Sequence, residues 1–144
     1  PKGVMSEIRE GFVKQLRLRL CANHPCQLAV IEALKGPHDH MEVTRRKLRE
    51  RGDFAWKRLN EIEGISTTRP KGAFYIFPKV LSKRWRTDKE FVLDVLYNTH
   101  VLFVHGSGFD PTYGAGHFRC VFLPPVEVLS DAFDRLEGFM KGKS

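Results

Sequence analysis

Residues 106–123 read GSGFDPTYGAGHFRCVFL, a glycine-rich loop that leads into a stretch of alternating character. The alternation of HFRCVFL predicts a β-strand with one buried face made of Phe118, Cys120 and Phe122. The opposite face carries His117, Arg119, Val121 and Leu123. Two prolines, Pro124 and Pro125, end the predicted strand.

Arg119 is the residue of this strand that calls for an explanation. An arginine among so many apolar side chains is costly to bury unless an anion meets it, and a carboxylate fits its guanidinium bidentately. The preceding glycines, which tolerate positive φ, would let the main chain approach such a ligand closely. Two interpretations are open: an anion-binding arginine, or a strand-end arginine paired with a local Asp or Glu.

In the N-terminal part of the chain, helical periodicity predicts three helices before the first strand. They cover about residues 5–20, a short segment from the N-cap Asn23 to Lys35, and about residues 39–62. The segments ISTT (65–68) and AFYIF (73–77) then read as two strands of a hairpin, joined by the proline and glycine of RPKG.

The rest of the chain alternates again between helix and strand. The segment TDKE (87–90) matches a capping box and begins a helix, and VLFVH (101–105) is the next predicted strand. A closing amphipathic helix carries apolar residues at helical spacing: Leu129, Phe133, Leu136 and Met140. This order predicts an α/β domain of the two-layer α+β kind, with a small mixed, largely antiparallel sheet packed with helices.

Composition narrows the function classes without selecting one. The 144 residues are 42% hydrophobic, enough for one domain with a real core. The net charge of +7 permits a nucleic-acid or acidic-membrane partner, but solvated helix faces explain it as well. No run of apolar residues suffices to span a bilayer. With solvated helix faces as the simpler interpretation of the charge, we expect no membrane partner. Three cysteines without a CxxC pair favour a reducing compartment, and we expect a cytoplasmic protein.

The cysteines and histidines near the second predicted helix are the candidates for a metal site. Cys21, His24 and Cys26 lie in the sequence not far from the HDH run at 38–40. Their spacings match no standard zinc module, so helix-boundary residues are the simpler interpretation and we predict no metal site.

Three long segments together resemble the C-terminal part of class I, fold-type I aminotransferases that use pyridoxal phosphate. They are LNEIEGISTTRPKGAFYIFPKV (59–80), DKEFVLDVLYNTHVLFVHGSGF (88–109) and GAGHFRCVFLPPVEVLSDAFDRLEGFM (114–140). They occur in the family's order, and the likeness, which covers essentially the whole chain, is nearest to archaeal alanine-aminotransferase-like enzymes. The resemblance implies that residues 1–36 are the last helices of the large domain and that residues 37–144 are the small domain.

The same resemblance implies roles for several residues. Arg119 falls on the position that grips the substrate α-carboxylate, after the GSGF loop. Further substrate-binding candidates are Asn23, Ala73, Phe74 and Tyr75. The alternative for Asn23 is a helix cap, and the alternative for the other three is a place in a core strand. Many relatives have proline where His105 stands and glycine where Asp110 stands, so this loop departs from the family pattern.

The implied activity is transfer of an amino group between an alanine-like amino acid and a 2-oxo acid, in a homodimer. The lysine that binds pyridoxal phosphate covalently and the phosphate-binding residues belong to the family's large domain, ahead of Pro1. We therefore expect this chain alone to bind no cofactor, to supply no catalytic residue and to be inactive. Two alternatives stay open: a non-catalytic interaction module with this fold, and a basic nucleic-acid-binding domain, although we expect no specific nucleic acid.

Overall fold

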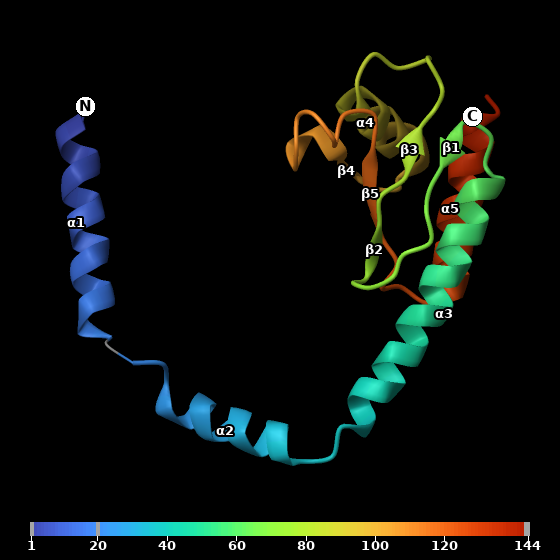
Figure 1. The fold of residues 1–144 in the computed structure, drawn as a ribbon. Helices are drawn as coiled ribbons and strands as arrows, with labels where there is room; N and C mark the ends of the chain where they lie inside the picture. The colour runs from blue at the N-terminus through green and yellow to red at the C-terminus, as the bar shows by residue number, and fades with distance from the viewer. Residues whose placement is uncertain (1, 20, 143–144) are drawn as a thin grey trace. The chain divides into compact units, whose positions relative to one another are not determined.

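Three helices precede every strand in the computed structural model, which describes residues 2–19 and 21–142 (Figure 1). They are α1 (Lys2–Leu18), α2 (His24–Lys35) and α3 (Asp39–Glu61). The predicted helices are confirmed, except that Leu20, the predicted end of the first one, lies outside the described residues. The chain divides into two units, Pro1–His40 and Met41–Ser144, and each is described by itself.

The first unit leaves its apolar side chains exposed. Along α1, Ile8 is 49%, Phe12 64% and Leu16 72% exposed, and none of the described residues of α2 is buried. Asn23 stands at the N-cap position of α2, but its side chain makes no capping hydrogen bond. Among the described residues no helix has the length and apolar character needed to cross a membrane.

The second unit contains two small antiparallel sheets. In one, β1 (Ile65–Ser66) pairs with β3 (Lys79–Val80). In the other, the central strand β5 (Phe118–Val121) lies between β2 (Tyr75–Ile76) and β4 (Val104–His105). The two predicted strands near the C-terminal end are confirmed, each shorter than expected.

The predicted hairpin between residues 65–68 and 73–77 is wrong, because β1 and β2 belong to different sheets. The segment between them is held by side chains of α3. Asn60 accepts from the backbone N–H of Thr67 and donates to its carbonyl, both at 3.0 Å. Arg69 donates two hydrogen bonds to Asp53, at 2.7 and 2.8 Å. The backbone N–H and carbonyl of Thr67 thus bond to α3, and the next strand, β2, pairs with β5.

Helices α4 (Asp88–Thr99) and α5 (Val126–Met140) complete the fold, and the core lies between the helices and the three-stranded sheet. The predicted N-cap is confirmed, since the Thr87 hydroxyl accepts from the N–H of Glu90 at 3.1 Å. Gly52 lets α3 approach the sheet closely, because a Cβ there would lie 3.2 Å from the Phe122 ring. The core residues include Leu59, Phe91, Val95, Phe118, Phe133 and Leu136.

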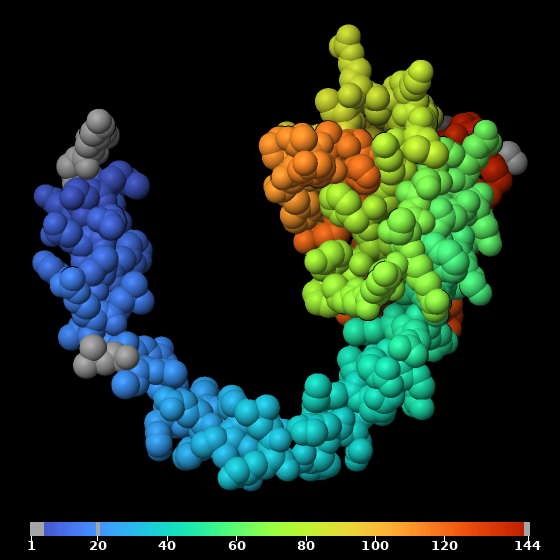
Figure 2. Space-filling view, in the orientation of Figure 1, coloured from blue at the N-terminus to red at the C-terminus, as the bar shows by residue number. Residues whose placement is uncertain are grey.

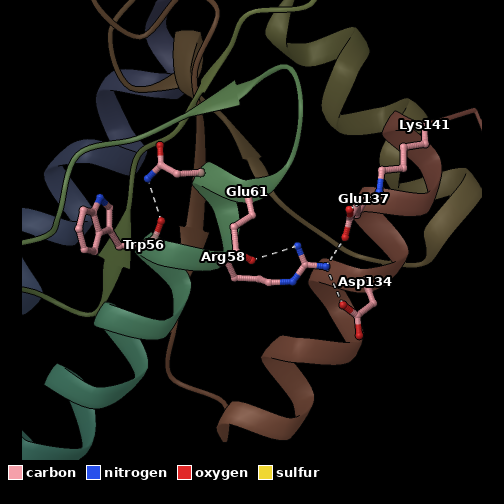
Figure 3. Close-up of polar contacts among 7 residues, drawn as sticks. Trp56, Arg58, Glu61, Asp134, Glu137 and Lys141 are labelled. Atoms are coloured by element: carbon pink, nitrogen blue, oxygen red, sulfur yellow. Dashed lines mark hydrogen bonds and ion pairs between the residues drawn. The ribbon is translucent and has the colours of Figure 1, made fainter.

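An ionic cluster joins α3 to α5, which lie side by side (Figures 1 and 3). Arg58 donates to Asp134 at 2.7 Å and also to Glu137, and its guanidinium lies 3.8 Å from Glu61. Glu137 accepts a further bond from Lys141. Hydrogen bonds from Lys141 and Arg58 lower the pKa of Glu137 to about 2.

Candidate functional site

The face of the three-stranded sheet that points away from the core carries the candidate site. The alternation along β5 is as predicted: Phe118, Cys120 and Phe122 are buried, at 0%, 3% and 2% exposure. Phe118 packs against the rings of Phe91 and Phe103, at centroid distances of 5.2 and 4.8 Å. These contacts fix the orientation of β5, so Arg119 projects from its opposite face.

Two aromatic rings lie against the guanidinium of Arg119. Its Cζ atom is 4.5 Å from the ring centre of Phe109 and 5.6 Å from that of Tyr75. Tyr75 belongs to β2 and Phe109 to the loop after β4, the two strands that flank β5. Both distances are in the range of cation–π attraction, so the rings hold the guanidinium without neutralising its charge.

Arg119 has no partner for its charge within the part of the chain that the structure describes. Its Nε atom is buried and has no hydrogen-bond partner there, and none of the ion pairs formed there includes Arg119. A local Asp or Glu, the alternative that the sequence left open, does not pair with it. An unpaired buried donor on a cation is costly, and the described residues supply no acceptor for this Nε–H.

The glycine-rich loop beside Arg119 is packed against itself, which differs from the expected role of its glycines. A Cβ on Gly106 would lie 2.3 Å from the carbonyl oxygen of Gly114, and one on Gly108 would lie 2.8 Å from the ring of His105. Gly116 alone among the loop's four described glycines has a positive φ, +72°. Most of these glycines therefore allow close internal packing and not free motion. Figure 2 shows the loop (orange) lying against the yellow-green segment that contains Phe77.

Buried and exposed carboxylates organise this loop. Asp88, at the start of α4 and only 6% exposed, accepts from the backbone N–H of Ser107 at 2.7 Å. Burial alone would raise the pKa of Asp88, but hydrogen bonds from Ser107 and from the backbone of Asp88 and Gly116 hold that pKa below its usual value. Asp110 accepts from the N–H groups of Thr112 and Tyr113, at 2.8 and 2.6 Å.

Of the predicted site residues, the structure brings together Arg119 and Tyr75. Phe74 lies edge-on to Tyr75 at 5.8 Å, and its carbonyl accepts from the N–H of Phe122 at 2.9 Å. Ala73 is exposed and has a φ of +58°, a conformation that non-glycine residues rarely adopt. Asn23 is an exposed residue of the first unit. The substrate-binding roles of all five residues stay predictions.

Two residues of the site were not singled out from the sequence. Of the two rings at the guanidinium, that of Phe109 is the nearer. The sequence feature that could have indicated it is an aromatic residue directly after GSG. In the sequence Asp88 stands inside a predicted capping box, and nothing local marks it as the carboxylate that binds Ser107, 19 positions later.

The cysteines and histidines form no candidate metal centre among the residues that the structure describes. Cys21 and Cys26 are exposed, whereas Cys120 is buried. Burial raises the pKa of the Cys120 thiol to about 12, so it stays protonated and unreactive at neutral pH.

No protein-family model matches the chain, but individual proteins do. The solved structure of an alanine aminotransferase from Pyrococcus furiosus superposes with a TM-score of 0.84 and 61% identity, over 96% of this chain and 35% of that one. The glutamate-pyruvate aminotransferase AlaA of Escherichia coli is 36% identical over 92% of this chain and 34% of its own length. The alanine aminotransferase of Mycobacterium tuberculosis is 37% identical over 97% of this chain and 33% of its own. The chain thus spans about a third of the length of these relatives.

Proposed function

The chain belongs to the fold-type I aminotransferases, whose C-terminal part it matches, and we propose that it supplies the substrate-carboxylate contact of such an enzyme. One observation carries this proposal: Arg119 is a cation with a buried, unpartnered Nε, held between two aromatic rings on the sheet face opposite the core. A carboxylate is the anion that fits a guanidinium with two parallel hydrogen bonds.

The substrates that we propose are an alanine-like amino acid and a 2-oxo acid. The α-carboxylate is common to both, so one arginine serves the binding of either. Relatives named for alanine or for glutamate and pyruvate support this class. The rings of Phe109 and Tyr75 lie against the guanidinium and restrict its orientation, which favours one direction of approach for the carboxylate.

The cofactor of the proposed full-length enzyme is pyridoxal phosphate, which supplies an electron sink when bound. None of the lysines of this sequence lies in a segment that resembles the family's cofactor-binding motif. We therefore propose that this chain alone binds and orients the carboxylate without performing the transfer. A homodimer and a cytoplasmic location are part of the same proposal.

The test is the variant Arg119→Lys, titrated with acetate and, in parallel, with methylammonium, which lacks a carboxylate. Lysine keeps the charge but not the planar donor pair. We expect the binding free energy of acetate to weaken by about 1.5–3 kcal/mol, because a bidentate charge-assisted contact is lost. The free energy of unfolding should stay nearly unchanged.

The matched control is Arg135→Lys, which alters an exposed arginine that pairs with Asp131 at 2.7 Å on α5. It should bind acetate like the unaltered chain. Unchanged acetate affinity in Arg119→Lys, together with a clear loss of stability, would show that Arg119 has a structural role only.

A further inference from the structure

The carboxylate of Asp88 is a buried charge whose partners lie in a distant loop. Asp88 is 6% exposed at the first position of α4, and burying an ionised carboxylate is costly unless hydrogen bonds compensate it. The bond of 2.7 Å from the N–H of Ser107 does so, and the backbone of Gly116 also favours its ionised form. Ser107 begins the loop of residues 107–116, so the Asp88 carboxylate binds the first residue of that loop.

That loop carries Phe109, the ring nearest to the guanidinium of Arg119. Inside the loop, the N–H of Phe109 donates to the carbonyl of Gly106 at 2.9 Å. The N–H of Gly114 donates to the backbone carbonyl of Asp110, also at 2.9 Å. These hydrogen bonds and the close contacts between its glycines hold the loop together internally. The bond to Asp88 is therefore one of the contacts that place the Phe109 ring over Arg119, beside the Phe77 ring, whose centroid lies 6.2 Å from that of Phe109.

We infer that Asp88 is a positioning residue for Arg119: it holds the start of the 107–116 loop at Ser107 and thereby helps to set the Phe109 ring against the guanidinium. The inference rests on the proposed function in one respect, because it assigns Asp88 an effect on carboxylate affinity. The spatial relation between Asp88, Phe109 and Arg119 does not depend on that function.

The experiment compares the isosteric variants Asp88→Asn and Glu90→Gln in the full chain. Both remove one negative charge from the first turn of α4, but Glu90 bonds the N–H of Arg86, at 2.9 Å, and not the loop. The readout is the nuclear magnetic resonance signal of the Arg119 Nε–H, which the Phe109 ring current displaces. The variant Phe109→Leu gives the position of that signal without the ring.

We expect Asp88→Asn to move the Arg119 signal part of the way toward its position in Phe109→Leu, since the amide keeps only one acceptor oxygen. Asp88→Ala should move it further, and Glu90→Gln should leave it in place. Acetate affinity should fall roughly two- to tenfold in Asp88→Asn, as for the loss of a positioning contact. A folded Asp88→Asn with an unmoved Arg119 signal overturns the inference, whether or not Asp88→Ala folds.

The two proposals fail in different ways. If the unaltered chain shows the ring-current displacement but binds no acetate, the proposed function fails while the positioning of Arg119 by Asp88 is still decided by the signal. If acetate binds through Arg119 and neither Asp88 variant moves the signal or weakens binding, the positioning role alone is overturned.

Discussion

Gly106 and Gly114 touch backbone to backbone, and no side chain fits at either position. A Cβ on Gly106 would lie 2.3 Å from the carbonyl oxygen of Gly114, and a Cβ on Gly114 would lie 2.1 Å from that of Gly106. The ring of Phe77 would also lie 2.9 Å from the Gly106 Cβ. This contact folds the loop next to Arg119 into a fixed piece, in which the glycines serve packing.

The variant Gly106→Ala should therefore destabilise the chain by about 1–3 kcal/mol, the usual cost of forcing a methyl group into filled space. The obstacle is backbone, which cannot move aside as a flexible side chain does. Gly72→Ala is the matched control, because no described atom lies within 4 Å of a Cβ there. Urea unfolding measures both. Equal stabilities of the two variants would contradict the packing role of Gly106.

Much of the fold could be predicted because its signals are local. The helices follow from apolar residues that recur at helical spacing, and the start of α4 follows from Thr87 and Glu90, three positions apart. The strand around Arg119 follows from strict alternation of buried and outward residues. Each of these patterns is read within one element, so no knowledge of distant contacts is needed.

The false hairpin shows where local signals fail. The proline and glycine of residues 69–72 are typical of a tight turn, but Asn60 and Asp53 of α3 bind Thr67 and Arg69 instead. These are contacts between different elements, and a strand of two residues such as β3 has too few positions to show a period. The same limit hid Asp88, whose carboxylate is explained only by a loop far along the chain.

The ionic cluster of Figure 3 predicts a loss of stability in acid. The pKa of Glu137 is lowered to about 2 in the folded state, below its unfolded value of 4.5. Its contribution is therefore fully present above about pH 4.5 and is lost as the pH falls toward 2.

Thermal unfolding between pH 2 and pH 5 checks this, with Glu137→Gln beside the unaltered chain. The variant should have a lower Tm at pH 5 and a flatter dependence of Tm on pH, because the carboxylate that titrates is gone. Asp131→Asn, which removes an exposed carboxylate of the same helix that pairs with Arg135, should keep the steep dependence. Parallel curves for Glu137→Gln and the unaltered chain would refute the assignment.

Incubation with pyridoxal phosphate and borohydride tests whether this chain alone binds the cofactor. We expect no stoichiometric pyridoxyl group on any single lysine, because no lysine of this sequence lies in a segment that resembles the family's cofactor-binding motif. Mass mapping after reduction is the measurement, with pyridoxal-treated lysozyme as the control for scattered surface labelling. One fully labelled lysine would overturn the expectation and assign cofactor binding to this chain.

The exposed stripe of α1, made of Ile8, Phe12 and Leu16, predicts self-association of the chain through this helix. Apolar patches of this kind are seldom left in water, and a second copy offers a complementary stripe. Phe12→Ser should lower the mass measured by light scattering. Lys14→Ser is the matched control, since it lies roughly 200° around the helix from Phe12 and should keep the mass of the unaltered chain. A strict monomer of the unaltered chain at every concentration would refute association through α1, and an equal mass for Phe12→Ser would place the contact elsewhere.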